Sequence, residues 1–251
     1  MPSTSAASVP LPRPPGLLSA GASLLLDFDG TLVDLADRPD AVAFDPPLIA
    51  LLGRLTGTFG GRIALVSGRS VAQLEHFLGG ALGGIALVGS HGAEMRIGDR
   101  HLSPDRPASL AQAERIVRAQ IGDRAGVVIE AKSLGIAIHY RMAPALEGEA
   151  RALAERIATD TGLVVQDGKM MIELHAAGHD KGAGIAGLMR QPGFAGTKPI
   201  FLGDDLTDEA GFAVVATLGG MPVLVGPPRP TAARYRLADV AAVRAWLGYA
   251  A

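Results

Sequence analysis

Two acidic residues come directly after a short apolar run near the start of the chain. Asp27 and Asp29 belong to an Asp-x-Asp-Gly-Thr segment that follows residues 24–26, and Gly30 lets the backbone turn away sharply. Because side chains alternate along a strand, both carboxylates point to the same side. Two carboxylates this close disfavour joint ionisation without a cation, and hard oxygens with no histidine or cysteine nearby favour Mg²⁺. The segment predicts a metal site; the alternative is a turn with two solvated acids.

A second acidic segment, Gly-Asp-Asp-Leu-Thr-Asp-Glu at residues 203–209, follows another apolar run. Four acids in six residues at one strand end are costly unless a cation lies there. A helix beginning near Thr207 accounts for some of them as N-terminal caps. It does not account for Asp204 and Asp205, which precede that helix. A cation is therefore expected at this strand end as well.

A hydroxyl and an amine complete the set of candidate groups. Ser67 follows the strand-like run 62–66 and opens a helix, where a hydroxyl and free N–H groups bind phosphate; it is also expected to cap that helix. Lys181 precedes a helix, a place where a lone lysine is usually solvated. Metal-binding acids, a nucleophile, a hydroxyl donor and a compensating cation together suit phosphoryl transfer, in which catalysis is mostly positioning and charge stabilisation.

These segments lie in a chain whose apolar pattern alternates between strand and helix. Such alternation predicts an α/β core with a parallel sheet covered on both faces. Ligands bind beyond the carboxyl ends of parallel strands, which is where the candidate groups are expected to meet. The expected strands are 24–28, 62–66, 85–88, 199–202 and 221–225, and the expected helices are 46–55, 71–78 and 240–247.

The middle of the chain breaks this rhythm. Its order is helix, strand, strand, helix, strand, strand, which predicts an inserted α+β unit with an antiparallel sheet. Alternation makes one side of that sheet apolar, packed on the two helices. The other side either faces solvent or closes over a site as a lid does. The expected helices are 110–121 and 145–159, the strands are 127–132, 136–141, 163–166 and 170–175, and the polar side carries Glu130, Lys132, His139, Arg141, Glu173 and His175.

Composition excludes several classes of protein. The 251 residues, 48% of them hydrophobic, can bury a sizeable core, and 23 basic against 25 acidic residues argue against a nucleic-acid binder. No apolar run approaches the ~20 residues that span a bilayer. The absence of cysteine excludes disulfides and thiolate catalysis and fits a cytoplasmic protein. Residues 1–20 are rich in proline and are expected to form a disordered or extended tail rather than a signal peptide.

The four chemical segments resemble, in order, the motifs of the haloacid dehalogenase (HAD) superfamily of phosphotransferases. The resemblance implies a Rossmann-like core in which Asp27 attacks phosphorus to form an aspartyl-phosphate. Asp29 would protonate the leaving group and then activate water. Ser67 and Lys181 would bind the transferring phosphoryl group. The implied magnesium ligands are Asp27, Asp29 through its main-chain carbonyl, Asp204, and in support Asp205 and Asp208.

Within the superfamily, the sequence more closely resembles the trehalose-6-phosphate phosphatase family. The resemblance rests on Val-Ser-Gly-Arg at 66–69, Gly-Ser-His-Gly-Ala-Glu at 89–94, a Glu-x-Lys and a His-Tyr-Arg segment in the insert, and the Asp-Asp-x-Thr-Asp-Glu form of the last motif. One departure is Ala-Ala-Gly at 176–178, where the family often has a basic residue and proline. The resemblance covers about residues 24–247.

This family resemblance implies a catalytic core of residues 21–103 and 177–251 and a type-two cap of residues 104–176 that recognises the sugar. The expected activity is Mg²⁺-dependent hydrolysis of trehalose 6-phosphate. The implied substrate-binding residues are Arg69, His91, Glu130, Lys132, His139, Arg141 and Glu173.

Two alternatives remain open on the sequence. The nearer one is the same chemistry on another sugar phosphate, such as sucrose 6-phosphate or mannosyl-3-phosphoglycerate. The other is a signalling receiver module, which also combines acids, a phospho-accepting aspartate, a hydroxyl and a lysine but has no inserted cap. The expected partner is a small sugar phosphate, without nucleic acid or membrane, and the resemblance allows a functional link to a trehalose-6-phosphate synthase.

Overall fold

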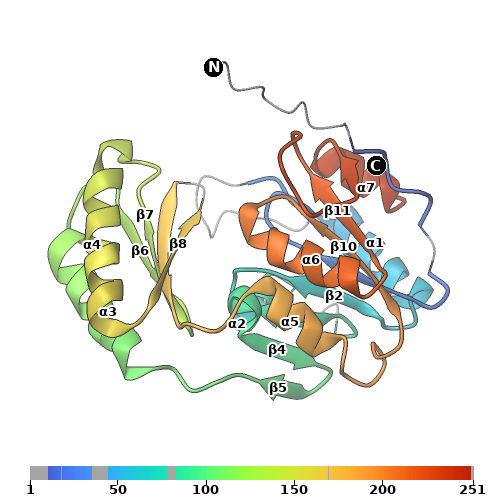
Figure 1. The fold of residues 1–251 in the computed structure, drawn as a ribbon, viewed down its shortest axis with the longest axis horizontal. Helices are drawn as coiled ribbons and strands as arrows, with labels where there is room; N and C mark the ends of the chain where they lie inside the picture. Colours follow the sequence, from blue (N-terminus) through green and yellow to red (C-terminus); the bar gives the residue numbers. More distant parts are fainter. Residues whose placement is uncertain (1–10, 18, 36–44, 79–82, 169, 250–251) are drawn as a thin grey trace, which may run out of the picture. The chain divides into compact units, whose positions relative to one another are not determined.

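The computed structural model describes residues 11–17, 19–35, 45–78, 83–168 and 170–249. The chain divides into two compact units (Figure 1). One unit contains Met1–Leu102 and Asp180–Ala251, and the other contains Ser103–His179. The second unit is therefore inserted between two parts of the first, and the insertion expected from the sequence is confirmed.

The first unit is built on an eight-stranded sheet with the order β12-β11-β10-β1-β2-β3-β4-β5. Strands β12 to β3 are parallel, and β4 and β5 add an antiparallel edge beside β3. The parallel core confirms the α/β prediction, whereas β4, β5 and β12 were not predicted. The strands are β1 (Ala22–Leu26), β2 (Ile63–Val66), β3 (Ala86–Gly89), β4 (Glu94–Ile97), β5 (Arg100–Leu102), β10 (Lys198–Gly203), β11 (Met221–Val225) and β12 (Tyr235–Leu237).

Helices cover both faces of this sheet. Leu24 and Leu26 of β1 pack in one cluster with α1, α2 and α7, whereas Leu25 packs in a second cluster with α5 and α6. Strand β1 is buried along its whole length, as expected for a central parallel strand between two helical layers. The helices are α1 (Pro46–Thr58), α2 (Val71–Leu78), α5 (Lys181–Leu188), α6 (Glu209–Thr217) and α7 (Val240–Trp246), with the 3₁₀ turns η2 (Ser90–Gly92) and η4 (Leu206–Asp208).

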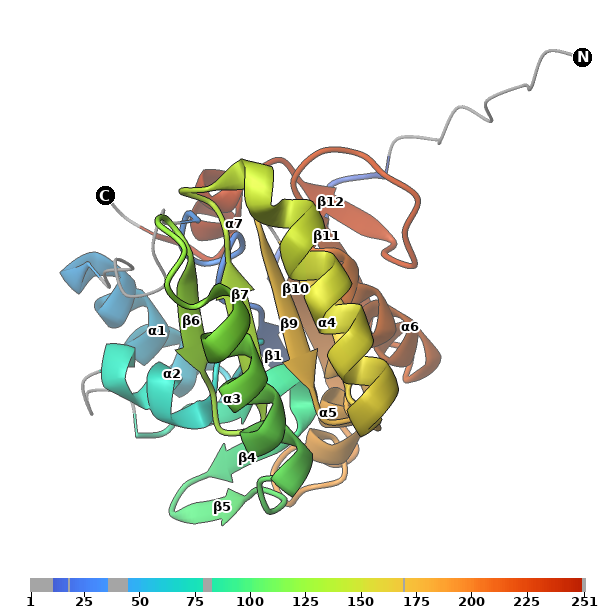
Figure 2. The ribbon, with the colours of Figure 1, turned by 90° about the vertical axis from the view of Figure 1, so that its left-hand side faces the viewer.

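The second unit is an antiparallel four-stranded sheet, in the order β6-β7-β9-β8, with two helices on one face. Figure 2 shows α3 and α4 side by side over this sheet. Ile136, Ile138 and Ile172 point into the core that the helices cover, so the predicted apolar face is confirmed. The elements are α3 (Ala108–Ile121), β6 (Val128–Ala131), β7 (Gly135–His139), the 3₁₀ turn η3 (Pro144–Leu146), α4 (Glu147–Thr161), β8 (Val164–Gly168) and β9 (Met171–His175).

Among the strands of this unit, β6 and β9 lose one or two end residues of their predicted ranges, and β7 ends two residues early. We expected a strand over 136–141 with Arg141 on the polar face, but β7 ends at His139 and Arg141 lies in the turn that follows. Tyr140 still packs with Ile136 and Ile138 in the apolar core, as alternation predicts, but the chain turns at residues 141–142, so Arg141 is not part of the strand.

The N-terminal tail falls partly outside the described residues, which begin at Leu11 and omit position 18. Residues 11–17 form no helix or strand and run against the first unit. The carbonyl of Pro12 accepts the Arg236 N–H at 3.0 Å, and that of Pro15 accepts the Trp246 Nε1–H at 2.9 Å. The described part of the tail thus has no regular secondary structure and is hydrogen-bonded to the first unit. In the described part of the chain, no helix combines the length and apolar character needed to cross a membrane.

Candidate functional site

The carboxyl ends of three neighbouring parallel strands carry the candidate chemical groups. Asp27 follows β1, Ser67 follows β2 and Asp204 follows β10. Strand β1 pairs with both β2 and β10, and the Asp27 N–H donates to the Leu202 carbonyl at 2.9 Å. The predicted meeting of the first and last acidic segments at one sheet edge follows from this strand order.

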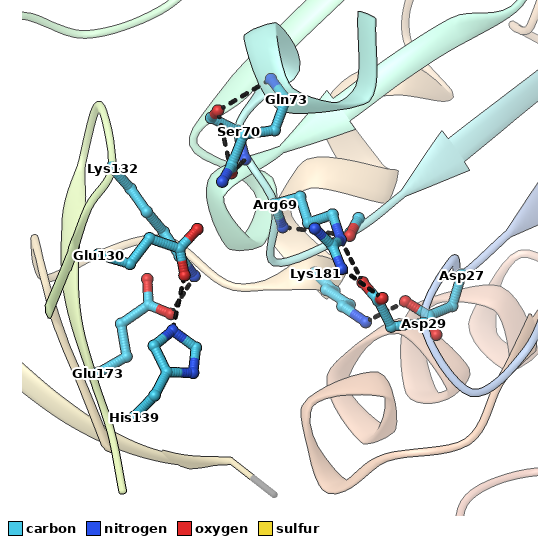
Figure 3. A network of polar contacts seen from close by, with 11 residues as sticks. Asp27, Asp29, Arg69, Ser70, Gln73, Glu130, Lys132, His139, Glu173 and Lys181 are labelled. Carbon is cyan, nitrogen blue, oxygen red and sulfur yellow. Dashed lines mark hydrogen bonds and ion pairs between the residues drawn. The ribbon is translucent and has the colours of Figure 1, made fainter. Parts of the chain in front are cut away.

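Lys181, the first residue of α5, joins the two acidic segments. Its Nζ donates to Asp27 Oδ1 at 2.7 Å and to Asp208 Oδ1 at 2.6 Å, and all three side chains are buried (Figure 3 draws the Lys181–Asp27 contact). Burial raises the pKa of Asp27 and of Asp208 above the ordinary value, although the ammonium group opposes the shift. Burial by itself lowers the pKa of Lys181, but the carboxylates of Asp208 and Asp27 outweigh it and the net shift is upward. Lys181 is therefore held charged.

Three carboxylates form a group with the composition of a metal site. Asp27, Asp204 and Asp208 each offer one oxygen, and these oxygens lie within 4.8 Å of one another. One ammonium group cannot balance three carboxylates, so the group retains negative charge for a cation to neutralise. Three hard oxygen donors suit Mg²⁺.

Two glycines make room for these carboxylates. A Cβ on Gly30, which has φ +83°, would lie 2.2 Å from Asp204 Oδ2, and a Cβ on Gly203 would lie 2.4 Å from Asp208 Cγ. Side chains at either position would displace a carboxylate of the group. The glycine of Asp-x-Asp-Gly-Thr thus provides both the turn and the space for Asp204.

Asp29 binds an arginine rather than joining the group of three. Arg69 Nε and Nη2 donate to Asp29 Oδ2 and Oδ1 at 2.6 and 2.7 Å, a bidentate pair (Figure 3). The Arg69 guanidinium also lies over the rings of Phe28 and Phe77, 5.5 and 4.8 Å from their centroids. Two aromatic faces and a carboxylate together fix the guanidinium plane.

Asp205 is a helix cap, which corrects our expectation that capping would not account for it. Its side chain accepts the Leu206 N–H at 2.7 Å, and its own N–H donates to Asp208 Oδ2 at 2.9 Å. A 3₁₀ turn begins at Leu206, earlier than the helix expected near Thr207. This capping box satisfies the turn's free N–H groups and fixes Asp208 at the same time.

The helix after Ser67 is also capped by a different residue from the one predicted. Ser70 and Gln73 close its N-terminus: the Gln73 N–H donates to Ser70 Oγ at 3.2 Å, and the Ser70 N–H donates to Gln73 Oε1 at 2.9 Å (Figure 3). Ser67 is buried, and its Oγ accepts the Arg69 N–H at 3.1 Å. The Ser67 hydroxyl is therefore not used by the helix cap.

The segment 89–94 supports the Ser67 loop from behind. The Ser90 N–H donates to the Arg69 carbonyl at 2.8 Å, and the His91 N–H donates to the Ser67 carbonyl at 3.2 Å. Ser90 and His91 have φ of 48° and 54°, a left-handed conformation that is costly for residues other than glycine. The His91 ring lies against Gly68, where a Cβ would come within 2.5 Å of it. We predicted His91 as a binding residue; its main chain also holds the loop.

The polar face of the second unit carries one ion pair and one histidine–carboxylate contact. Lys132 Nζ contacts Glu173 Oε2, and both side chains are buried. His139 Nε2 lies 2.7 Å from Glu130 Oε2 (Figure 3 draws both pairs). Glu130 and Glu173 flank Ala137 of β7 in the strand register, which places them on one face. Arg141 lies in the turn beyond this face.

The profile of the trehalose-phosphatase family matches residues 25–241. The chain belongs to the trehalose-phosphatase family. It is 41% identical over 213 residues to a protein of Sinorhizobium fredii named "Probable trehalose-phosphate phosphatase", covering 83% of this chain and 79% of that protein. It is 38% identical over 233 residues to the trehalose-6-phosphate phosphatase of Escherichia coli K12, covering 92% of this chain and 86% of that one.

A solved structure supports the same assignment. The crystal structure of a trehalose-6-phosphate phosphatase related protein shares 30% identity with this chain at a TM-score of 0.75, covering 90% of this chain and 95% of that one. The HAD-like core with an inserted antiparallel cap, predicted from the sequence, is thus confirmed for this member of the family.

Two structural residues of this trehalose-phosphatase family member escaped the sequence reasoning. The carboxylate of Glu94, a buried residue of β4, accepts the Val71 N–H at 2.8 Å and so caps the N-terminus of α2. Arg229 contacts the main chain of Asp205 from a loop far along the sequence. Glu94 belongs to the segment 89–94, but no local sequence pattern links it to residue 71, and apart from its neighbouring prolines no sequence pattern marks Arg229.

Proposed function

We propose that the protein is a Mg²⁺-dependent phosphatase that hydrolyses trehalose 6-phosphate to trehalose and inorganic phosphate. The observation that carries the proposal is the buried group of Asp27, Asp204 and Asp208 around Lys181, in a chain that belongs to the trehalose-phosphatase family. The substrate in the name of its E. coli relative is the one that we assign here.

In the proposed first step, a carboxylate oxygen of Asp27 attacks phosphorus and the bond to the sugar oxygen breaks. Asp29, which must be protonated and so release one of its contacts with Arg69, gives its proton to that oxygen; trehalose leaves as a neutral alcohol and Asp29 is left as the carboxylate. In the second step, Asp29 takes a proton from water, the water oxygen attacks phosphorus, and the acyl–phosphate bond breaks. Phosphate leaves and the Asp27 carboxylate is restored.

Asp27, Asp204 and Asp208 would hold the magnesium ion, with the main-chain carbonyl of Asp29. Asp205 supports them through its hydrogen bonds to Leu206 and Asp208. A bound Mg²⁺ supplies positive charge against the oxygens of the transferring phosphoryl group. Ser67 and Lys181 bind the same phosphoryl group, the first with a hydroxyl and the second with a fixed ammonium charge.

Residues of the second unit, taken as the specificity cap, are proposed to read the sugar. Chemistry at phosphorus requires only core residues, which cannot distinguish one sugar from another. Buried polar groups that lose their partners in the wrong complex cost about 1–3 kcal/mol each, which is a basis for selectivity. The proposed sugar-binding residues are Glu130, Lys132, His139, Arg141 and Glu173 of the cap, with Arg69 and His91 of the core.

The test is phosphate release from a panel of substrates, with Mg²⁺ and with excess chelator. Trehalose 6-phosphate should give the highest kcat/KM, above sucrose 6-phosphate, mannosyl-3-phosphoglycerate and an aryl phosphate. Chelation should abolish release, and added Mg²⁺ should restore it. A higher kcat/KM for another sugar phosphate would overturn the substrate assignment, and full activity in chelator would overturn the metal-dependent mechanism.

A further inference from the structure

The loop after β11 is fastened to the last acidic segment by one arginine. Arg229 Nη1 forms an ion pair with Glu209 Oε1, and its Nη2 donates to the main-chain carbonyl of Asp205 at 2.8 Å. Both side chains of the pair are mostly buried. The acidic segment contains Glu209 as its last residue, and the proposed chemistry gives that residue no part.

Glu209 is itself held by the loop that carries Arg229. Its Oε2 accepts the Thr231 hydroxyl at 3.1 Å and the Ala232 N–H at 2.8 Å. Prolines at 227, 228 and 230 restrict the backbone on both sides of Arg229. The guanidinium is thus presented to the Asp205 carbonyl from a stiff loop, with Glu209 fixing its orientation.

The peptide that Arg229 contacts lies between two of the candidate metal ligands. Asp204 immediately precedes Asp205, and the Asp205 N–H donates to Asp208 Oδ2 at 2.9 Å. Displacement of the Asp205 backbone would therefore move both carboxylates. Lys181 Nζ donates to the other oxygen of Asp208, Oδ1, at 2.6 Å, but this contact does not hold the Asp205 backbone.

We propose that Arg229 and Glu209 are positioning residues that set Asp204 and Asp208 for the divalent cation. The proposal rests on the metal site of the proposed function and adds the two residues that hold its ligands in position. The planar fork of arginine allows two N–H groups to reach different acceptors at once, whereas a lysine at 229 could serve only one of them well.

The sign of the expected effect separates positioning from simple electrostatics. Arg229 is a positive charge near the site, so its removal would tighten cation binding if charge alone mattered. A positioning role predicts weaker binding instead. Loss of residues that orient metal ligands typically costs about 10–100-fold in metal affinity.

The experiment is calorimetric titration of the metal-free full chain with Mg²⁺. We expect Arg229→Met and Glu209→Gln each to weaken binding about 10-fold, and Arg229→Lys to give a smaller loss. Arg234→Met is the matched control, since it removes the same charge from an exposed side chain of the same loop; its affinity should equal that of the unsubstituted protein. The double variant Arg229→Met/Glu209→Gln should be little weaker than either single one, because the two residues act as a unit.

Unchanged or tighter Mg²⁺ binding by Arg229→Met would overturn the proposal. A lower Tm of this variant in chelator, with unchanged Mg²⁺ affinity, would also overturn it, because Arg229 would then stabilise the fold without positioning the metal ligands. If Arg229→Met does not fold, Arg229→Lys tests position alone because it keeps the charge, and unchanged affinity in both Arg229→Lys and Glu209→Gln overturns the proposal. Absence of Mg²⁺ binding by the unsubstituted protein would instead overturn the metal site of the proposed function, whatever the variants do.

Discussion

At the scale of single residues, one ammonium group stabilises a set of carboxylates that burial would otherwise disfavour. Lys181 contacts Asp27 and Asp208, whose pKa values burial raises. The free energy of this arrangement depends on the amine more than on either acid, because removing it leaves two buried negative charges without their counter-ion. The core thus places Asp27, the proposed nucleophile, beside a charged ammonium group.

Lys181→Met should therefore lower the free energy of unfolding by about 3 kcal/mol in metal-free solution at neutral pH. A carboxyl whose folded pKa is raised destabilises the fold fully above its folded pKa; this cost shrinks as pH falls below the folded pKa and is gone below the unfolded pKa. The loss should consequently shrink on acidification. Denaturant unfolding at neutral and acidic pH measures it, and Lys198→Met, on an exposed residue, is the control. A loss that grew with acidity would contradict the raised pKa values.

Asp29→Asn tests the proposed acid and base separately from the nucleophile. General acid–base catalysis contributes about 10²–10⁴-fold, so kcat for trehalose 6-phosphate should fall by at least about 100-fold. A good leaving group needs less protonation, so the first step on an activated aryl phosphate should fall less. Rapid-quench kinetics on both substrates would show the difference. Equal loss of the first step on both would argue that Asp29 only orients Arg69.

At the scale of elements, strands with an apolar pattern could be predicted from the sequence, whereas strands and helix caps that depend on tertiary contacts could not. Strands β1, β2, β3, β10 and β11 were predicted because buried parallel strands are short apolar runs. Strand β5 has three exposed residues and no apolar run, so only its pairing with β4 reveals it. Capping was mispredicted at Ser67 and at Asp205, since a cap depends on the residue at which a helix begins.

The polar face of the cap sheet gives a prediction that belongs to this scale. Lys132→Ala and Glu173→Ala each break the buried pair between β9 and the residue that follows β6. If the face reads the sugar, each should lower kcat/KM for trehalose 6-phosphate at least about 10-fold, and much less for a small aryl phosphate.

Both substrates should be measured on each variant, with the fold checked by circular dichroism. Glu155→Ala, on an exposed position of α4, is the control. Equal losses on both substrates would mean that the pair maintains structure rather than recognises the sugar. No loss on either substrate would mean that this buried pair has no part in sugar recognition.

At the scale of the whole molecule, an insertion divides a parallel α/β unit without disturbing its strand order. Strands β1 and β10 are far apart in the sequence yet pair in the centre of the sheet, so the last acidic segment reaches the first. The sequence predicted this meeting from the carboxyl-end rule for parallel sheets. It could not predict the bidentate pair of Arg69 and Asp29 or the contact of Arg229 with Asp205, because such distant contacts depend on packed geometry.

The most direct test of the whole account is the transfer of labelled phosphate from trehalose 6-phosphate to Asp27. The protein with Mg²⁺ is mixed with substrate labelled in its phosphate, quenched in acid within one turnover, and digested for peptide mapping. We predict acid-stable label on the peptide that contains Asp27, and none in Asp27→Asn. Release of phosphate without any labelled protein, or label that persists in Asp27→Asn, would contradict Asp27 as the nucleophile of a trehalose-6-phosphate phosphatase.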